Sequence, residues 1–265
     1  MNTFLKPSSI LKKNSISIFL QEAGSISNFT WRFLTSWFRP TYEINEFFRQ
    51  CFYIGNLSLP LIGLTGFIMG LVLTMQLRPT MTDYGVASQI PAIVGIAIIR
   101  EIGPVISALI FAGKIGSSIG AELGSMKVTE QIDAMEVSGT NPFKYLVVSR
   151  VLACTLMLPV LSIWSDAIAL FGAYIGININ GQTSFHLFQT QVVDALSFND
   201  VIPAFVKTFV FGFAVGIIGC YKGYHCRKGT VGVGKSANSA VVVSSVMIFI
   251  IDLLVVQITD ILGFN

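Results

Sequence analysis

The sequence predicts an all-α integral membrane protein with an N-terminal interfacial helix, five transmembrane helices and a short helix between the second and third spans. Hydrophobic residues make up 53% of the 265 residues and charged residues only 12%. A soluble domain usually carries about 25% charged residues. Apolar windows of about 20 residues, the length that crosses a bilayer, recur along the chain. The few basic residues lie beside these windows, which argues against nucleic-acid binding.

The chain divides into an N-terminal segment, residues 1–40, and a membrane domain, residues 41–265. Tryptophan and phenylalanine alternate with arginine in residues 31–39. Such residues suit the headgroup layer, so we expect part of this segment to lie on the membrane surface and residues 1–25 to form a loosely ordered tail. After Pro40, aromatic residues at helical spacing predict an interfacial helix that leads into the first span.

Five apolar windows define the expected spans. They cover residues 57–77, 87–113, 145–175, 201–221 and 237–262. Pro159 lies inside the third window, but its two halves are too short to be separate crossings. Lysine and arginine gather before the first span, between the second and third, and between the fourth and fifth. The positive-inside rule therefore places the N-terminus in the cytoplasm and the C-terminus outside.

Two glycine patterns occur inside the predicted spans. One is Gly63-x-x-Gly66-x-x-x-Gly70 and the other is Gly113-x-x-Gly116-x-x-x-Gly120. Small residues at this spacing let helix backbones approach closely, either within one subunit or across a dimer.

The Arg100-Glu101 pair interrupts the second span. Charged side chains are costly in lipid and by default indicate a functional site in the bundle interior. Adjacent residues point about 100° apart on a helix, so at least one must face a cavity, a lipid headgroup or another helix. Gly103-Pro104 follows and permits a kink. The alternative is that the pair lies near the outer interface and extends toward water.

Three further charged residues lie inside spans: Asp166, Lys207 and Asp252. Pairing of Lys207 with Asp252 or with Glu101 would lower the cost of removing both charges from water. Such a pair could serve transport or be structural only.

The segment 122–140, between the second and third spans, predicts a short amphipathic helix. Its apolar positions are Val128, Ile132 and Met135, and its other face carries Lys127, Glu130, Asp133 and Glu136. The segment is too short to cross the membrane, and its acidic residues disfavour contact with anionic lipid. We therefore expect this helix to dock into a groove on a cytoplasmic protein.

Two other motifs could suggest a bound nucleotide or a metal ion, but neither supports a cofactor. Residues 229–236, GTVGVGKS, fit the phosphate-loop pattern, but they follow a polar, basic stretch rather than a buried strand. We expect a flexible glycine-rich cytoplasmic turn there. Cys220, His225 and Cys226 lack a fourth metal ligand within the pattern, so we interpret them as ordinary loop residues.

Three sequence blocks together resemble the MlaE/YrbE permeases of lipid ABC transporters, and the resemblance extends from about Tyr42 to the end. The blocks are LTGFIMGLVLTMQ, REIGPVISALIFAGKIGSSIGAELGSMKVTEQIDAMEV and NPFKYLVVSRVLA. The AEL…M…TEQIDA portion is the most specific. The resemblance implies a homodimer in the bacterial inner membrane that moves phospholipid between inner and outer membranes and so affects outer-membrane lipid asymmetry. It also implies a cytoplasmic ATPase pair, which binds the ATP in place of this chain, and a periplasmic MCE-domain protein.

The resemblance also implies roles for particular residues. A lipid cavity would be formed by Arg100, Glu101, Leu73, Gln76, Leu77, Lys207 and Asp252. A coupling helix would contact the ATPase through Glu122, Met126, Thr129, Glu130, Asp133 and Met135. In this scheme Arg100 meets a lipid phosphate, since a guanidinium donates to phosphate in a fixed fork, and Glu101 orients it or gates the cavity.

Two alternatives belong to other functional classes. A membrane-embedded enzyme could use Glu101 and Asp252 as an acid/base pair, but the chain offers no nucleophile–base pair or metal ligands. An ion-coupled carrier usually has inverted repeats, and none is visible here. The sequence thus favours a transport subunit that is not itself an enzyme and has no catalytic residues of its own.

Overall fold

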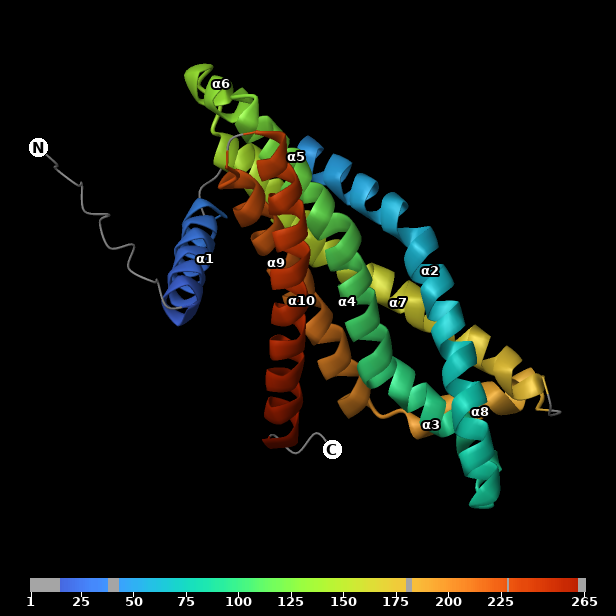
Figure 1. The fold of residues 1–265 in the computed structure, drawn as a ribbon. Helices are drawn as coiled ribbons and strands as arrows, with labels where there is room; N and C mark the ends of the chain where they lie inside the picture. Colours follow the sequence, from blue (N-terminus) through green and yellow to red (C-terminus); the bar gives the residue numbers. More distant parts are fainter. Residues whose placement is uncertain (1–14, 38–42, 180–182, 228, 262–265) are drawn as a thin grey trace, which may run out of the picture.

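The computed structural model describes residues 15–37, 43–179, 183–227 and 229–261, and within these ranges every regular element is helical (Figure 1). The helices are α1 Ser15–Trp37, α2 Ile44–Asp83, α3 Ile90–Ala97, α4 Gly103–Phe111, α5 Ser117–Val128, α6 Gln131–Val137, α7 Ser149–Asn178, α8 Phe185–Ala195, α9 Phe198–Tyr224 and α10 Thr230–Ile261. A 3₁₀ turn, η1 Ala87–Gln89, and three π-helical turns, η2 Ile98–Ile102, η3 Ala112–Gly116 and η4 Phe143–Val148, join some of them.

Five stretches are long and apolar enough to cross a membrane, as the sequence predicts. They are Ile44–Asp83, Ala87–Val128, Phe143–Asn178, Phe198–Tyr224 and Thr230–Ile261. The chain is therefore a multi-pass, all-α membrane protein. Pro159 lies inside α7 without ending it. The start of α2 and the end of α10 lie at opposite ends of the bundle, and the lower ends of these two helices diverge (Figure 1).

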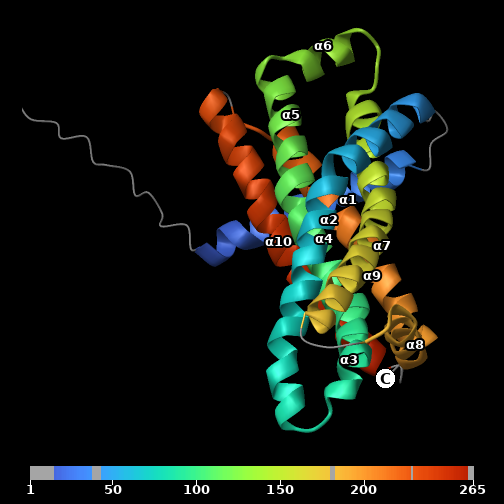
Figure 2. The same cartoon turned by 90° about the vertical axis from the view of Figure 1, so that its right-hand side faces the viewer.

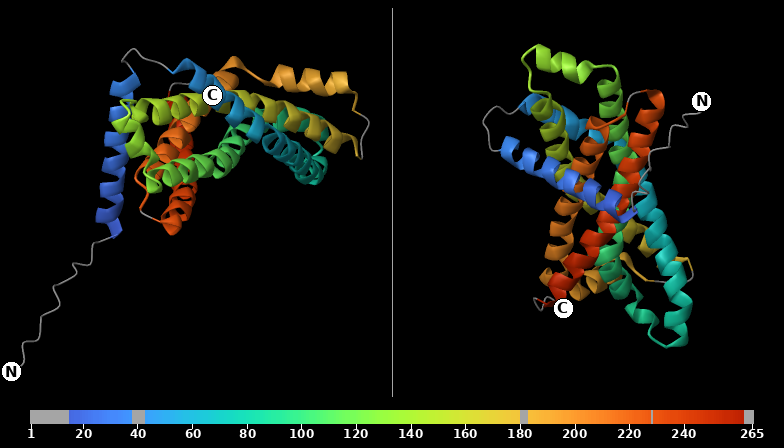
Figure 3. Two further views of the ribbon diagram at one scale, coloured as in Figure 1. Left: turned by 90° about the horizontal axis from the view of Figure 1, so that it is seen from above. Right: turned by 60° about the vertical axis from the view of Figure 1, so that its left-hand side comes forward.

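The N-terminal segment differs from the prediction. Helix α1 begins at Ser15, so the loosely ordered tail expected over residues 1–25 is wrong for residues 15–25, while residues 1–14 and the expected boundary at residue 40 lie outside the described ranges. Helix α1 crosses one side of the bundle (Figure 3), where Phe29 and Phe33 are buried. The guanidinium of Arg32 lies 4.3 Å from the ring centre of Phe143. The sequence pattern around Arg32 did not predict that Phe29 and Phe33 would pack against the bundle.

The glycines of α2 serve packing within the subunit. Gly66 and Gly70 lie against the backbone of α7, and Gly172 of α7 lies in turn against the Phe67 carbonyl. Close backbone approach of this kind requires residues without a Cβ. The first glycine pattern is thus explained without a second copy of the chain.

We expect Gly70→Ala to loosen the α2–α7 contact. An added Cβ would overlap the carbonyl oxygen of Ala169, and overpacking typically costs about 1–3 kcal/mol. Melting of the detergent-purified protein, followed by size-exclusion fluorescence, measures the loss. Gly113→Ala is the matched control, since a Cβ at Gly113 meets nothing within 4 Å. Equal melting temperatures for the two variants would contradict this account of the packing.

The second span is interrupted by two of the π turns. Pro104 has no amide hydrogen, so the carbonyl of Arg100 loses its usual partner four residues on. The chain widens there, and the Gly103 amide bonds to the Ile98 carbonyl instead. Such π-helical turns often occur at functional sites. The turn presents both Arg100 and Glu101 toward α9.

Helix α8 is absent from the predicted elements. It is too short to span the membrane and packs against α3, with Phe188 and Val192 buried in a small apolar cluster. The Ser184 hydroxyl accepts a hydrogen bond from the Leu187 amide at 3.2 Å and so caps its first turn. A serine before an apolar run at helical spacing was the sequence signal for the start of this helix.

The glycine-rich turn predicted for residues 229–236 is wrong. Gly229 has a positive φ of 93°, and α10 starts immediately after it. The Ser236 hydroxyl donates to the carbonyl oxygens of Lys222 at 2.6 Å and Gly120 at 3.3 Å. The segment is therefore the packed beginning of a span.

Candidate functional site

A buried lysine lies at the centre of the strongest site. Lys207 of α9 has a side chain only 2% exposed, and its Nζ donates to Glu101 Oε2 at 2.7 Å and to Asp252 Oδ1 at 3.0 Å. These residues belong to three different spans. The predicted pairing of Lys207 is therefore confirmed for both carboxylates. One ammonium between two carboxylates offsets much of the cost of removing the three charges from water.

A second ion pair adjoins this network. Arg100 Nη1 lies 3.3 Å from Asp200 Oδ1. Asp200 also accepts from the Ser197 hydroxyl at 2.7 Å and the Ser197 amide at 3.1 Å, which is a capping box at the start of α9. The cap holds the carboxylate where Arg100 can reach it. Asp200 was missed at the sequence level, although Ser197-x-x-Asp200 before an apolar run was its signal.

The two ion pairs open into one small pocket. Its walls come from η2, from the first turns of α9 and from the last part of α10; the lining residues are Arg100, Glu101, Asn199, Asp200, Pro203, Ala204, Lys207, Val255, Val256 and Thr259. The side chains of Arg100 and Glu101 remain 35% and 38% exposed. The pocket thus offers a guanidinium held by Asp200 and a carboxylate held by the buried Lys207 to a polar or charged group.

The structure does not bring the three α2 residues into this pocket. Leu73 and Leu77 pack against the cluster around Val94 and Phe188, and Gln76 is exposed. The reason is the tight α2–α7 contact, which directs this face of α2 toward α3 and α8 within the subunit. Only Arg100, Glu101, Lys207 and Asp252 of the predicted cavity residues form one cluster in the chain.

Asp166 stands apart from the network. Among the described residues its Oδ1 is buried without a hydrogen-bond partner, and it lies against Gly103 at the start of α4. A hollow beside it is also lined by Ser162 and Thr208. Asp166 therefore shares no direct ion pair with Lys207.

The predicted coupling residues lie around α6, which joins α5 to the start of the third span at one end of the bundle (Figure 2). Lys127 Nζ and Asp133 Oδ1 are 2.7 Å apart, which fastens α6 to the end of α5. Glu130, at the turn, is the sole non-glycine residue with positive φ in the described ranges, at 59°. Ile132 is fully buried, whereas Val137 is 90% exposed.

Four more of these residues make contacts within the chain. Glu122 Oε1 accepts from the buried Arg150 at 2.9 Å, and the Thr129 hydroxyl donates to the Ser125 carbonyl at 2.9 Å. Met126 and Met135 are half-buried against the main core. Glu122 therefore anchors the base of the loop, and Glu130, Asp133 and Val137 form its outer surface.

No group of three His, Cys, Asp or Glu side chains in the described part of the chain could hold a metal ion. Cys220 is buried inside α9, so its interpretation as a loop residue is wrong. His225 Nδ1 lies 3.0 Å from the Tyr221 carbonyl oxygen.

Comparison with known proteins identifies the family. The profile of the permease MlaE family matches residues 47–258, which includes the whole charge network and α6. The chain belongs to the MlaE permease family.

Relatives of this MlaE-family chain carry the same general description. A probable ABC transporter permease protein of Rickettsia typhi is 38% identical over 255 residues, covering 96% of this chain and 97% of the relative. One from the cyanobacterium Synechocystis is 36% identical over 197 residues, covering 74% and 75%. One from Pyropia yezoensis is 39% identical over 212 residues, covering 78% and 79%. The chain is thus an ABC transporter permease of the MlaE family, a transport component rather than an enzyme.

Proposed function

We propose that this MlaE-family permease moves phospholipids, or closely related lipids, between the inner and outer membranes of a bacterium. It acts as a homodimer, and a separate cytoplasmic ATPase pair supplies the energy. A periplasmic MCE-domain protein receives or delivers the lipid. The observation that carries the proposal is the Lys207 network, in which a buried ammonium holds Glu101 and Asp252 beside the half-exposed Arg100.

The chemistry of the Arg100 pocket suits a lipid headgroup. A guanidinium forms charge-assisted hydrogen bonds with phosphate, and Val255 and Val256 supply apolar walls beside it. The membrane-enzyme alternative is less consistent with this geometry, because Glu101 and Asp252 bind the same ammonium. Two carboxylates used as separate acid and base need environments that differ.

The exposed faces of α10 and α2 support a dimer around a lipid-accessible space. Exposed apolar residues follow one face of α10: Val242, Val246, Phe249 and Leu253. Those of α2 are Leu61, Leu64, Ile68 and Met75. In the proposed dimer these faces meet the second subunit or lipid acyl chains.

The proposed orientation follows from the basic residues and from α6. The α6 end of the bundle lies in the cytoplasm and the end of α10 in the periplasm, in accordance with the positive-inside rule. The exposed Glu130, Asp133 and Val137 then face an ATPase, and the chain itself binds no ATP.

We expect Arg100→Ala to lower the phospholipid that co-purifies with the transporter. A hydrogen bond to a charged group contributes roughly 1.5–3 kcal/mol, so retention falls by about tenfold or more. Mass spectrometry of lipid extracted from the complex in mild detergent measures this. Arg78→Ala is the control, since Arg78 bonds to the Ile177 carbonyl in another part of the chain. Unchanged lipid content and transport in Arg100→Ala would refute the proposed headgroup role.

A further inference from the structure

A second pocket lies at the α6 end of the bundle, far along the spans from the Arg100 site. It has a volume of about 440 Å³ and lies between the end of α1, the first turn of α2 and the start of the third span. None of its lining residues belongs to the charge network. The MlaE family assignment and the proposed transport path leave this pocket without a role.

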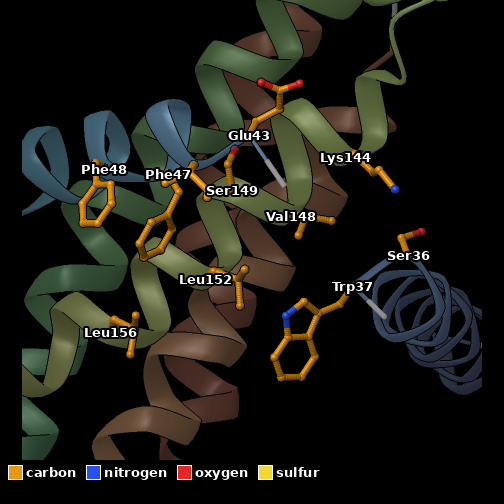
Figure 4. A pocket seen from close by; sticks show the side chains of 11 residues that line it. Ser36, Trp37, Glu43, Phe47, Phe48, Lys144, Val148, Ser149, Leu152 and Leu156 are labelled. Atoms are coloured by element: carbon orange, nitrogen blue, oxygen red, sulfur yellow. The ribbon is translucent and has the colours of Figure 1, made fainter. Parts of the chain in front are cut away.

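The pocket changes from charged to apolar along its length. In Figure 4 the Glu43 carboxylate and the Lys144 ammonium lie at one end, with Ser149 nearby, and Leu156 lies toward the other. The Trp37 indole forms a wall on the α1 side. Tryptophan commonly occupies the boundary between headgroups and acyl chains. This gradient matches the polarity of a membrane leaflet.

The dimensions also fit a lipid. Val148, the last residue of η4, and Leu152 and Leu156 of α7 are spaced four residues apart, so they form one apolar stripe along the third span. From Lys144 to Leu156 the helix extends about 18 Å, at about 1.5 Å per residue. Half of a hydrocarbon core about 30 Å thick is similar in depth. A single acyl chain can therefore follow the stripe from the headgroup layer toward the bilayer centre.

The charges at the pocket mouth favour a particular headgroup. The neighbouring Glu46 is already engaged, since its carboxylate bonds to Arg49, Gln50 and Tyr145. Glu43 also lines the pocket, and in Figure 4 its carboxylate lies at the same end as the Lys144 ammonium. One anionic and one cationic side chain together complement a zwitterion better than a net anion, because Glu43 repels a second negative charge.

We propose that this pocket binds one zwitterionic phospholipid with a primary ammonium headgroup, from the leaflet at the α6 end. Lys144 binds the phosphate, Glu43 binds the ammonium, and one acyl chain follows Val148, Leu152 and Leu156. The bound lipid fills the space between α1 and α7 and so stabilises the docking of α1. The proposal requires a membrane-embedded chain but does not depend on lipid being the transported cargo.

Photolabelling of the full chain in vesicles tests the site. The probes are phosphatidylethanolamine and phosphatidylglycerol, each with a diazirine in the acyl chain, and peptide mass spectrometry maps the labels. We expect the phosphatidylethanolamine probe to label the α7 peptide around Leu152 preferentially. Leu156→Trp fills the pocket and should lower this label by about tenfold. Val160→Trp, one turn further along α7 and outside the pocket, is the matched control and should leave the label unchanged; Val160 is 57% exposed and Leu156 48%.

The charged residues give a second readout. Glu43→Gln should remove the preference for phosphatidylethanolamine over phosphatidylglycerol, while Lys144→Gln should lower labelling by both. Equal labelling by the two probes in the unaltered protein, or equal effects of the two tryptophan variants, overturns the proposal. Failure of the phosphatidylethanolamine probe to label the α7 peptide also overturns it. Loss of transport in Arg100→Ala with this label retained separates the present site from the proposed function.

Discussion

Replacing Lys207 by methionine is expected to destabilise the permease more than any other single substitution in the charge network. The change removes the ammonium that binds Glu101 and Asp252 at 2.7 and 3.0 Å. Two carboxylates, 38% and 20% exposed, then lie close together without a cation. Breaking a buried ion pair by removing one partner typically costs about 3–5 kcal/mol. A thermal melt of the purified protein should show a large drop in midpoint, and reconstituted transport should be lost.

A neutral network separates stability from function. Lys207→Met combined with Glu101→Gln and Asp252→Asn removes all three charges, so much of the lost stability should return. Lipid retention should remain low, because the pocket then lacks the Glu101 carboxylate and its Lys207 partner, although Arg100 still pairs with Asp200. Glu101→Gln alone should be milder in the melt, since Asp252 still binds Lys207. A wild-type melting curve for Lys207→Met would show that the ion pairs contribute little to the fold.

The spans were predictable because their signal is local. Apolar windows and the positions of charged residues are properties of short segments, and the five spans follow from them directly. The pairing of Lys207 was also predictable, because an unpaired ammonium in a span is too costly to persist. The full lengths of the helices were harder to predict than the positions of the spans. The first turns of α2 and α10 are polar, and they become part of the spanning helices only through tertiary packing.

The parts that were missed depend on contacts distant in sequence. Asp200 reaches Arg100 because the η2 turn and the start of α9 meet at one level of the bundle. Leu73 and Leu77 pack against the cluster around Val94 and Phe188 because the glycines of α2 allow this helix to pack closely against α7. The glycine run at the start of α10 became helical since Ser236 bonds to two backbone carbonyls of neighbouring helices. None of these arrangements has a signature within a single segment.

The outer surface of α6 gives the second prediction with a large expected effect. Glu130→Lys together with Asp133→Lys should abolish co-purification of the ATPase. Each substitution reverses a charge on the surface proposed to dock into the partner, and like charges facing one another across an interface cost several kcal/mol. Affinity chromatography of the tagged permease, followed by quantification of the ATPase band, measures the loss.

A loss of binding alone does not establish that the ATPase contacts these charged side chains directly. Asp133 also pairs with Lys127 at 2.7 Å within the chain. Asp133→Lys therefore threatens the attachment of α6 to α5 as well as any interface. The exchange Lys127→Asp with Asp133→Lys keeps an ion pair inside the loop but moves its charges. If the ATPase contacts Asp133 directly, it should not co-purify with this exchange variant. If only the internal ion pair matters, the ATPase should co-purify with it. Val137→Ser, which removes an exposed apolar side chain without touching any charge, should weaken binding in the first case only.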